Sequence, residues 1–523
     1  MYTLYHNARI YTLSHQHTVC SALVTRGNKI IFTGKLNEIN LPEHAMQKID
    51  LHGRTVVPGF IDCHTHIGAV ALSAERLKLD NCRNLAEAQQ QIKRQLETFR
   101  EENWILGGGW NANIWPEGRP HKRDLDILSS DRPIALYNKD GHTVWLNSKA
   151  LQLAGFDQST PDPVGGKLGR DPGGELNGLV FETACYQVDQ KTDTVSYDFL
   201  NRCLTKYYPD LFRLGITSVH SCESLEFYHL FQQLAQEDRL KVRICMHPPM
   251  AEADIIIRDR KRSGSGDEWL RLGGLKYFVD GSLGSQTAEM FEPYEILGHA
   301  GISILEEAEL SERLLHAARH GLSATVHAIG DKANHKALNA FYRTKDVSGG
   351  LRHRIEHAQI LIPEDRQRYH ALNIIASMQP LHIADDIRIA NKYLGARTAN
   401  TYPINALIND QVRVVFGSDM PVADPDPLKG MLSAVSRRYK LDPNQPAWHP
   451  EHCVSPLQAL RCYTAEAAYA SYEEALKGTL EAGKLADFAV LSDDIIEGGE
   501  EALYRTRVTM TVINGKIVYH ADD

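Results

Sequence analysis

Short apolar runs alternate with amphipathic stretches through the middle of this chain. Each run has the length and the β-branched content of a buried strand, and helical stretches such as 310–321 and 365–372 lie between most of them. This alternation predicts an α/β fold with a parallel sheet, and eight such units favour a closed (β/α)8 TIM-like barrel over an open sheet. The expected strands are 57–62, 216–221, 242–247, 274–281, 323–330, 353–359, 373–379 and 412–419.

Both ends of the chain show a different pattern, in which short strands are joined by turns. Residues 8–57 and 484–520 are rich in β-branched residues, and Asn514-Gly515 is a hairpin signal. We expect residues 1–56 and 480–523 to build one small β-sandwich together, with the barrel over 57–479 between them. The alternative is two unrelated edge hairpins.

The gap between the first and second expected barrel strands is too long for a single connection. Residues from about 70 to 205 are therefore expected to form an inserted subdomain or lid.

Composition narrows the classes of function. The net charge of -9, with 43% hydrophobic and 24% charged residues, gives no support for binding nucleic acid or an anionic membrane surface. The sequence shows no long uncharged apolar segment and no signal-peptide pattern at its start, so no membrane association is expected. Nine scattered cysteines without CxxC pairs indicate free thiols in a reducing compartment, and we expect a cytoplasmic protein.

Residue types that bind metals stand at the expected strand ends, where barrels of this kind carry their active sites. The first strand ends in Asp62-Cys63-His64-Thr65-His66, and alternate side chains of an extended chain share a face. His64 and His66 can therefore grip one cation. An isolated HxH motif is without function about as often as it binds a metal.

Four further residues extend this pattern to other strands. A single histidine among 24 is more often a surface or satisfied core residue, and a strand lysine is usually a solvated edge residue or a salt-bridge partner. Their joint placement on expected strands makes chance a poor explanation and predicts a metal site. The residues are Lys276 on the fourth strand, His327 on the fifth, His357 on the sixth and Asp419 at the end of the eighth.

Motifs in order along nearly the whole chain resemble the amidohydrolase superfamily. Within it they are similar to the branch that contains N-substituted formamide deformylase, amidohydrolase family 3. The segments that carry the resemblance are VVPGFIDCHTHI at 56–67, GGGWN at 107–111, KDGHTVWLNSKAL at 139–151, GITSVHS at 215–221, KYFVDGSLGSQTA at 276–288, HAIGDKAN at 327–334, HRIEHAQ at 353–359, FGSDMPVADPDPLKGM at 416–431, YTAEAA at 463–468 and GKLADFAVL at 483–491.

The resemblance implies a role for each metal-site residue. His64 and His66 would bind one divalent metal with Asp419, while His327 and His357 would bind a second. Lys276 would bridge the two as a carboxylated lysine, because a carbamate supplies two anionic oxygens where an ammonium would be repelled. One metal beside an unmodified lysine is the alternative. Zinc is the leading candidate, and iron, manganese, cobalt and nickel remain open.

These roles imply a hydrolase of carbon–nitrogen bonds other than peptide bonds, acting on a small N-substituted amide or formamide. A metal-activated hydroxide would attack the carbonyl, and Asp419 would accept the proton and deliver it to the leaving nitrogen. The alternatives are a cyclic amidase or deaminase, a metal-dependent isomerase or decarboxylase, and a catalytically silent scaffold. The filled ligand positions argue against a silent scaffold. The resemblance is also compatible with a homodimer.

Five residues are candidates for substrate contact, each with an ordinary structural alternative. Trp110, after three glycines, is equally a core tryptophan beside a tight turn, and His142 is equally an ordinary turn histidine. Glu356 adjoins His357 in a strand, where neighbouring side chains face opposite ways, so we expect it to point away from the site as a structural residue. The five candidates are Trp110, His142, His220, Asp280 (which would orient a ligand) and His382.

Overall fold

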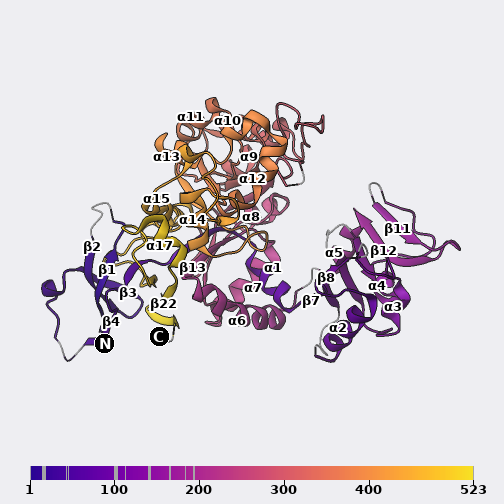
Figure 1. The fold of residues 1–523 in the computed structure, drawn as a ribbon, viewed down its shortest axis with the longest axis horizontal. Helices are drawn as coiled ribbons and strands as arrows, with labels where there is room; N and C mark the ends of the chain where they lie inside the picture. The colour runs from indigo at the N-terminus through magenta and orange to yellow at the C-terminus, as the bar shows by residue number, and fades with distance from the viewer. Residues whose placement is uncertain are drawn as a thin grey trace. The chain divides into compact units, whose positions relative to one another are not determined.

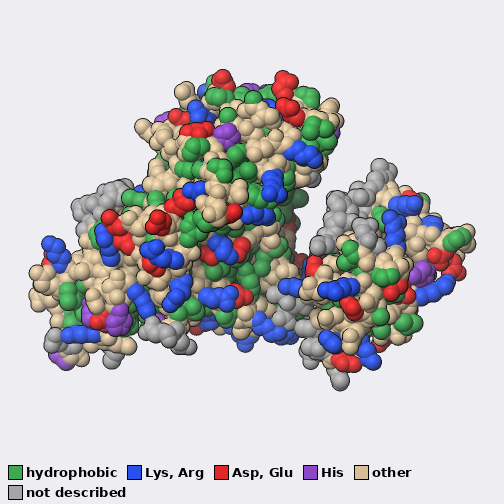
Figure 2. All heavy atoms as spheres, in the orientation of Figure 1, with side chains coloured by type: hydrophobic (Ala, Val, Ile, Leu, Met, Phe, Trp, Pro, Cys, Tyr) green, Lys and Arg blue, Asp and Glu red, His purple; other side chains and the backbone are tan. Residues whose placement is uncertain are grey.

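The structure is a computed structural model of the 523-residue chain. It describes residues 2–14, 19–42, 44, 46–98, 104–111, 114–138, 143–163, 166–182, 184–192, 195–284 and 286–521. The chain divides into two compact units, one made of Met1–Gly68 with Tyr207–Asp523 and the other of Ala69–Lys206. On the face that Figure 2 shows, acidic and basic side chains are intermingled on both units. No helix within the described ranges combines the length and the apolar character needed to cross a membrane.

Strands from both ends of the chain pair in one eight-stranded sheet, with the indigo N-terminal strands near the yellow C-terminal ones in Figure 1. Its order is β23-β22-β21-β5-β1-β2-β3, and β4 pairs with β1 off this path. The two ends meet where β5 and β21 run antiparallel, with Val57 opposite Ala489. The strands are β1 (Tyr2–Tyr11), β2 (Val19–Arg26), β3 (Lys29–Gly34), β4 (Met46–Asp50), β5 (Thr55–Pro58), β21 (Phe488–Leu491), β22 (Val508–Ile513) and β23 (Lys516–His520).

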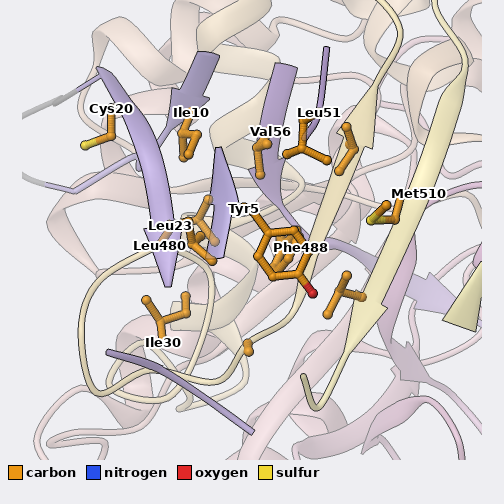
Figure 3. Close-up of a cluster of buried hydrophobic side chains, with 13 residues drawn as sticks. Tyr5, Ile10, Cys20, Leu23, Ile30, Leu51, Val56, Leu480, Phe488 and Met510 are labelled. Atoms are coloured by element: carbon orange, nitrogen blue, oxygen red, sulfur yellow. The ribbon is translucent and has the colours of Figure 1, made fainter. Parts of the chain in front are cut away.

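The buried side chains of this sheet come from both ends of the chain. Tyr5 of β1 packs edge-on against Phe488 of β21, with ring centroids 4.9 Å apart. Figure 3 shows them in one cluster with Val56, Leu480 and Met510. Neither end would bury its apolar face alone. The hydrogen bonds run through a single sheet, so the two facing layers of the expected β-sandwich are not seen as separate sheets.

The same unit contains two parallel sheets, and the α/β class predicted from the sequence is confirmed. Each of the eight expected strand segments contains a strand, and β15 is an additional short one. The four-stranded sheet has the order β15-β14-β13-β6, and the five-stranded sheet has the order β16-β17-β18-β19-β20. Their bounds are β6 (Phe60–Thr65), β13 (Ile216–Ser221), β14 (Arg243–Met246), β15 (Leu270–Leu272), β16 (Gly274–Phe278), β17 (Ser323–Ala328), β18 (Arg354–His357), β19 (Ile375–Met378) and β20 (Val414–Phe416).

The single closed barrel expected from the sequence is not seen as one continuous sheet. The ladder breaks at Gly273, because the N–H of Gly274 donates to Nδ1 of His247 at 2.8 Å instead of to a strand carbonyl. Isolated parallel bridges lie at the two junctions, between Pro249 and Lys276 and between Thr65 and Met420.

Helices follow most of these strands along the chain (Figure 1). In α9 the buried residues Leu310, Leu314, Ala317 and Ala318 recur at helical spacing, which places them on one side. The helices of this unit are α7 (Leu225–Gln236), α8 (Ala253–Arg258), α9 (Glu307–Arg319), α10 (Asp331–Thr344), α11 (Pro363–Ala371), α12 (Leu381–Tyr393), α13 (Ile404–Asn409), α14 (Pro427–Ser436), α15 (Pro456–Cys462), α16 (Ala465–Ala470) and α17 (Gly499–Arg505).

The unit Ala69–Lys206 has a sheet and an apolar core of its own. Its six strands have the order β11-β12-β10-β9-β8-β7. Helices α1 (Ile67–Glu75) and α6 (Tyr197–Arg213) contain the boundaries of the unit. The other elements are β7 (Leu77–Lys78), α2 (Leu85–Thr98), β8 (Ile105–Trp110), α3 (Lys122–Asp126), β9 (Ile134–Asn138), β10 (Thr143–Leu146), α4 (Ser148–Leu153), β11 (Gly166–Arg170), β12 (Leu176–Glu182) and α5 (Cys185–Thr192).

A buried ion pair ties the parallel strands to the terminal sheet. Nε of Arg243, the first residue of β14, lies 2.6 Å from Oδ2 of Asp487, and both side chains are almost fully buried. We expect Arg243→Met to lower the melting temperature by several degrees, because it leaves the carboxylate of Asp487 buried without a cation. Removing one partner of a buried pair typically costs about 3–5 kcal/mol. Thermal unfolding followed by circular dichroism measures the effect.

The matched control for this variant is Arg313→Met. Arg313 pairs with Glu309 on the exposed side of α9 at 2.7 Å, and exposed pairs contribute little. Equal melting temperatures for the two variants would contradict a stabilising role for the buried pair.

Candidate metal centre

Three potential ligand atoms converge at the C-terminal ends of the parallel strands. His64 lies on β6, His357 ends β18, and Asp419 follows β20. One ligand atom from each lies within 4.8 Å of the others, which is close enough to share a cation. Nε2 of His64 is 3.3 Å from Oδ1 of Asp419, and all three residues are largely buried. Imidazole nitrogen and carboxylate oxygen are donors that zinc favours.

The other three expected ligands lie beside this group. Nε2 of His66 is 3.5 Å from Oδ1 of Asp419. Nζ of Lys276, on β16, is 3.4 Å from Nε2 of His64. The ring of His327, on β17, is centred 4.4 Å from the ring of His357. The structure thus brings together residues from four strands and the loop after β20.

Hydrogen bonds decide which nitrogen of His66 carries its proton. Nδ1 lies 2.8 Å from the carbonyl oxygen of Cys222. A carbonyl oxygen can only accept, so Nδ1 donates, and in the neutral ring it is Nε2 that bears the lone pair, 3.5 Å from Oδ1 of Asp419. Two acceptors in this arrangement repel each other, and a cation between them removes the repulsion.

His327 and His357 are also neutral imidazoles with a free lone pair. Nε2 of His327 donates to the carbonyl of Gly281 at 2.9 Å, which leaves its Nδ1 unprotonated. Burial lowers the pKa of His327 to about 4. Burial likewise holds the pKa of His357 well below its usual value, and its Nδ1 has no hydrogen-bond partner among the described residues. This set of donors fits a divalent cation.

Two of the ligands lie where the backbone leaves the extended conformation. His357 has φ of 72° and Asp419 has φ of 61°, in the left-handed region that non-glycine residues seldom adopt. Such strain is often stored at functional sites. The turn at His357 interrupts the alternation of side chains along β18, so that Glu356 contacts His64 while His357 also reaches the ligand group. The expectation that Glu356 points away is therefore wrong.

A buried carboxylate that sequence reasoning left without a role anchors the loop of Asp419. Asp62 shares the strand face of His64, and its side chain accepts from the backbone N–H of Ser418 at 2.8 Å and from its hydroxyl at 2.5 Å. Burial raises the pKa of Asp62 to about 7, although these hydrogen bonds oppose the rise. The alternation Asp62-x-His64 was the signal for it.

A buried ion pair on β18 contacts His64 from behind. Oε2 of Glu356 contacts Nδ1 of His64, and Oε1 of Glu356 lies 2.5 Å from Nε of Arg354. Arg354 also donates to Nδ1 of His220 at 2.9 Å and to the carbonyl of Cys63 at 3.0 Å. The structure thus places His220, a candidate for substrate contact, against Arg354.

Two other candidates for substrate contact lie next to the ligands. The carboxylate of Asp280 accepts from the backbone of Glu289, Ile329 and Gly330, and its Oδ1 is 3.5 Å from Nε2 of His327. Burial raises the pKa of Asp280 to about 7 against these hydrogen bonds. The ring of His382 is nearly parallel to that of His357, with centroids 6.4 Å apart.

Trp110 lies in the core of the unit Ala69–Lys206. Its side chain is almost fully buried, and its indole N–H donates to the carbonyl of Leu136 at 2.7 Å. Its ring packs against those of Trp115 and Trp145, with centroids 6.2 Å away in each case. This geometry matches the alternative of a core tryptophan. His142 lies outside the described residues.

Comparison with known proteins finds similarity over most of the chain. A model of the amidohydrolase family matches residues 47–519. LONG AFTER FAR-RED 3 of Arabidopsis thaliana is 32% identical, covering 98% of this chain and 91% of that protein. N-substituted formamide deformylase of Arthrobacter pascens is 25% identical, covering 98% and 97%. The crystal structure of an uncharacterized metal-dependent hydrolase from Pyrococcus furiosus has a TM-score of 0.81 at 27% identity, covering 95% and 100%. The resemblance inferred from the motifs is confirmed.

The close approach of the Asp419 loop to β6 gives a test of the centre. A Cβ added at Gly417 would lie 2.4 Å from the backbone N and 2.9 Å from the Cβ of His64. We expect Gly417→Ala to displace His64 and to lose most of the bound metal, measured by elemental analysis of protein purified without chelator. Overpacking of this kind typically costs about 1–3 kcal/mol, so a moderate fall in melting temperature should accompany it.

Gly349→Ala is the matched control, because an added Cβ there meets nothing within 4 Å. It should keep the metal content and melting temperature of the unaltered protein. Full metal content in Gly417→Ala would show that the loop does not hold His64 in place.

Proposed function

This chain belongs to the amidohydrolase family and is a hydrolase of carbon–nitrogen bonds, and we propose that its substrate is a small N-substituted amide or formamide. The observation that carries the proposal is the convergence of imidazole lone pairs from His64, His66 and His357 around the carboxylate of Asp419. The relative from Arthrobacter pascens that is named N-substituted formamide deformylase supports the choice of substrate.

The proposed cofactor is a divalent cation, with zinc as the leading candidate. His64, His66 and Asp419 would hold it, and His327 and His357 would hold a second ion if two are present. A carboxylated Lys276 would then bridge them. When bound, such a cation lowers the pKa of a water toward about 7 and polarises the substrate carbonyl.

Asp419 is the proposed catalytic residue, because its carboxylate lies at the middle of the ligand set. Its Oδ1 is 3.3 Å from Nε2 of His64 and 3.5 Å from Nε2 of His66, so it borders the position proposed for the cation. There the carboxylate can accept a proton from the attacking water. It then delivers that proton to the leaving nitrogen, which departs as an amine.

An exposed aromatic side chain beside the ligands supports an apolar substituent on the substrate. Phe278 lies two residues after Lys276 on β16 and therefore on the same strand face. Its ring is centred 5.3 Å from that of His327, yet the residue is 46% exposed. We assign to Phe278 a contact with the apolar group attached to the scissile amide, with His382 lining the same position.

The proposal extends to the architecture that carries the site. The two parallel sheets would be two arcs of one (β/α)8 barrel, which the isolated bridges at both junctions support. Residues 1–56 and 480–523 would form the β-sandwich domain, and about 70–205 the inserted subdomain. The cytoplasmic location and the homodimer stay predictions.

Asp419→Asn tests the proposed proton transfer. Asparagine keeps the size and one oxygen ligand but cannot accept the proton, so we expect turnover to fall by about 10^2 to 10^4-fold. The fold and most of the metal should remain. Release of amine and elemental analysis measure the two effects on the same preparation.

The control for this variant is Asp424→Asn, five residues further along the same loop. Asp424 pairs with Lys429 at the surface, and its replacement should leave turnover unchanged. Turnover of Asp419→Asn within a few-fold of the unaltered enzyme would remove Asp419 from the mechanism.

Phe278→Ala tests the substrate assignment. We expect kcat/KM to fall about tenfold for N-benzylformamide, because burying an apolar group in a pocket is worth about 1–3 kcal/mol. Activity on N-methylformamide should change little. Tyr342→Ala, on α10 and 55% exposed, is the control aromatic variant and should change neither. Hydrolysis of a ring amide or an aminopurine, with no amine released from either formamide, would favour the cyclic amidase or deaminase instead.

A further inference from the structure

We propose that Arg354 and Glu356 form a buried positioning pair that fixes the tautomer and orientation of His64 before any metal binds. The inference rests on the proposed metal-dependent function and assigns these two residues a part in it. Glu356 and Arg354 are positioning residues, because they act through His64 and carry no contact with substrate.

The contact between Glu356 and His64 determines where the imidazole proton lies. An ionised carboxylate can only accept, so Nδ1 of His64 must donate to Oε2 of Glu356. Nε2 then presents its lone pair toward Oδ1 of Asp419, which is 3.3 Å away. Both His64 and Glu356 are essentially inaccessible to solvent, so bulk water cannot replace this acceptor.

Arg354 keeps the buried carboxylate charged. Its Nε lies 2.5 Å from Oε1 of Glu356, and its two terminal nitrogens donate to Nδ1 of His220 and to the carbonyl of Cys63. The guanidinium lies against this carboxylate where solvent is excluded, since Arg354 is 1% exposed and Glu356 is 0% exposed. Among the described residues, Glu356 is thus the anionic partner of this guanidinium, and its other contacts are neutral acceptors.

The backbone of β18 makes the arrangement possible. Arg354 and Glu356 are two residues apart and share one face of the strand, where the pairing places Glu356 opposite His327 on β17. His357 then turns into the left-handed region and reaches the same centre from the end of the strand. One strand therefore supplies both a ligand and the group that orients a ligand on β6.

An anionic acceptor on the remote nitrogen has two consequences for a metal site. It makes the imidazole more basic at the nitrogen that faces the metal, and it removes the need to select a tautomer during binding. Loss of such partners typically costs about 10- to 100-fold in metal affinity. A purely structural pair would contribute to melting temperature without this effect.

The experiment measures zinc affinity of the metal-free full-length protein by competition with a chromophoric chelator. We expect Glu356→Gln to raise the Kd for zinc about 10- to 100-fold. The double variant Arg354→Met/Glu356→Leu removes both charges, and replacing a buried pair by apolar groups is often neutral for stability. It should keep the melting temperature and lose affinity to a similar extent.

The matched control pair is Lys477 and Glu473, which are also buried and lie 2.9 Å apart. Lys477→Met/Glu473→Leu should leave the Kd for zinc unchanged. A second readout is the imidazole 15N spectrum of the metal-free protein, with the His64 signals assigned by their loss in His64→Asn. The unaltered protein should show the Nδ1–H form of His64, and the Arg354→Met/Glu356→Leu variant should show a mixture of both tautomers.

The outcomes separate this inference from the proposed function. Zinc binding by the unaltered protein, with the same Kd and the same His64 tautomer in both Glu356 variants, would overturn the positioning pair and leave the metal-dependent function standing. Failure of the unaltered protein to bind any of zinc, cobalt or manganese would overturn both.

Discussion

The centre depends on one constraint, which is that three of its imidazoles donate an N–H group away from Asp419. His66 donates to a backbone carbonyl, His327 donates to another, and His64 donates to a buried carboxylate. What remains at the middle is a set of lone pairs around an ionised side chain, with Nζ of Lys276 at its edge. Such a set is electrostatically unfavourable unless a cation occupies it, so the hydrogen bonds outside the centre define the chemistry inside it.

The strand ends supply this arrangement because they are not ideal strands. His357 and Asp419 both take left-handed backbone conformations, which aim side chains that regular pleating would turn elsewhere. These conformations are costly, and the surroundings stabilise them. Asp62 holds Ser418 through two hydrogen bonds, and Gly417 allows the loop to touch the backbone of His64. The buried polar groups beneath the ligands therefore hold a strained loop as well as carrying charge.

The wider fold keeps these strand ends in register. The terminal sheet needs both ends of the chain to bury its apolar face, and Arg243 ties that sheet to β14 through Asp487. The break in the ladder at Gly273 has a local cause, because His247 takes the N–H of Gly274. The sheet that carries Lys276 thus begins at Gly274, where His247, the residue after β14, accepts the hydrogen bond in place of a strand carbonyl. The unit Ala69–Lys206 has its own sheet and its own tryptophan-rich core.

The sequence by itself was sufficient where the signal is local. Alternation within one strand places His64 and His66 on a common face, and apolar runs of strand length mark all eight strands, because both are properties of a few consecutive residues. Only the tertiary structure decided that Glu356 faces His64. The left-handed backbone at His357 that permits it is not visible in the strand pattern, because alternation assumes extended residues throughout. The role of Trp110 was also decided only by the tertiary structure. Three glycines before a tryptophan occur both in cores and in binding sites, and the burial of the side chain distinguishes the two.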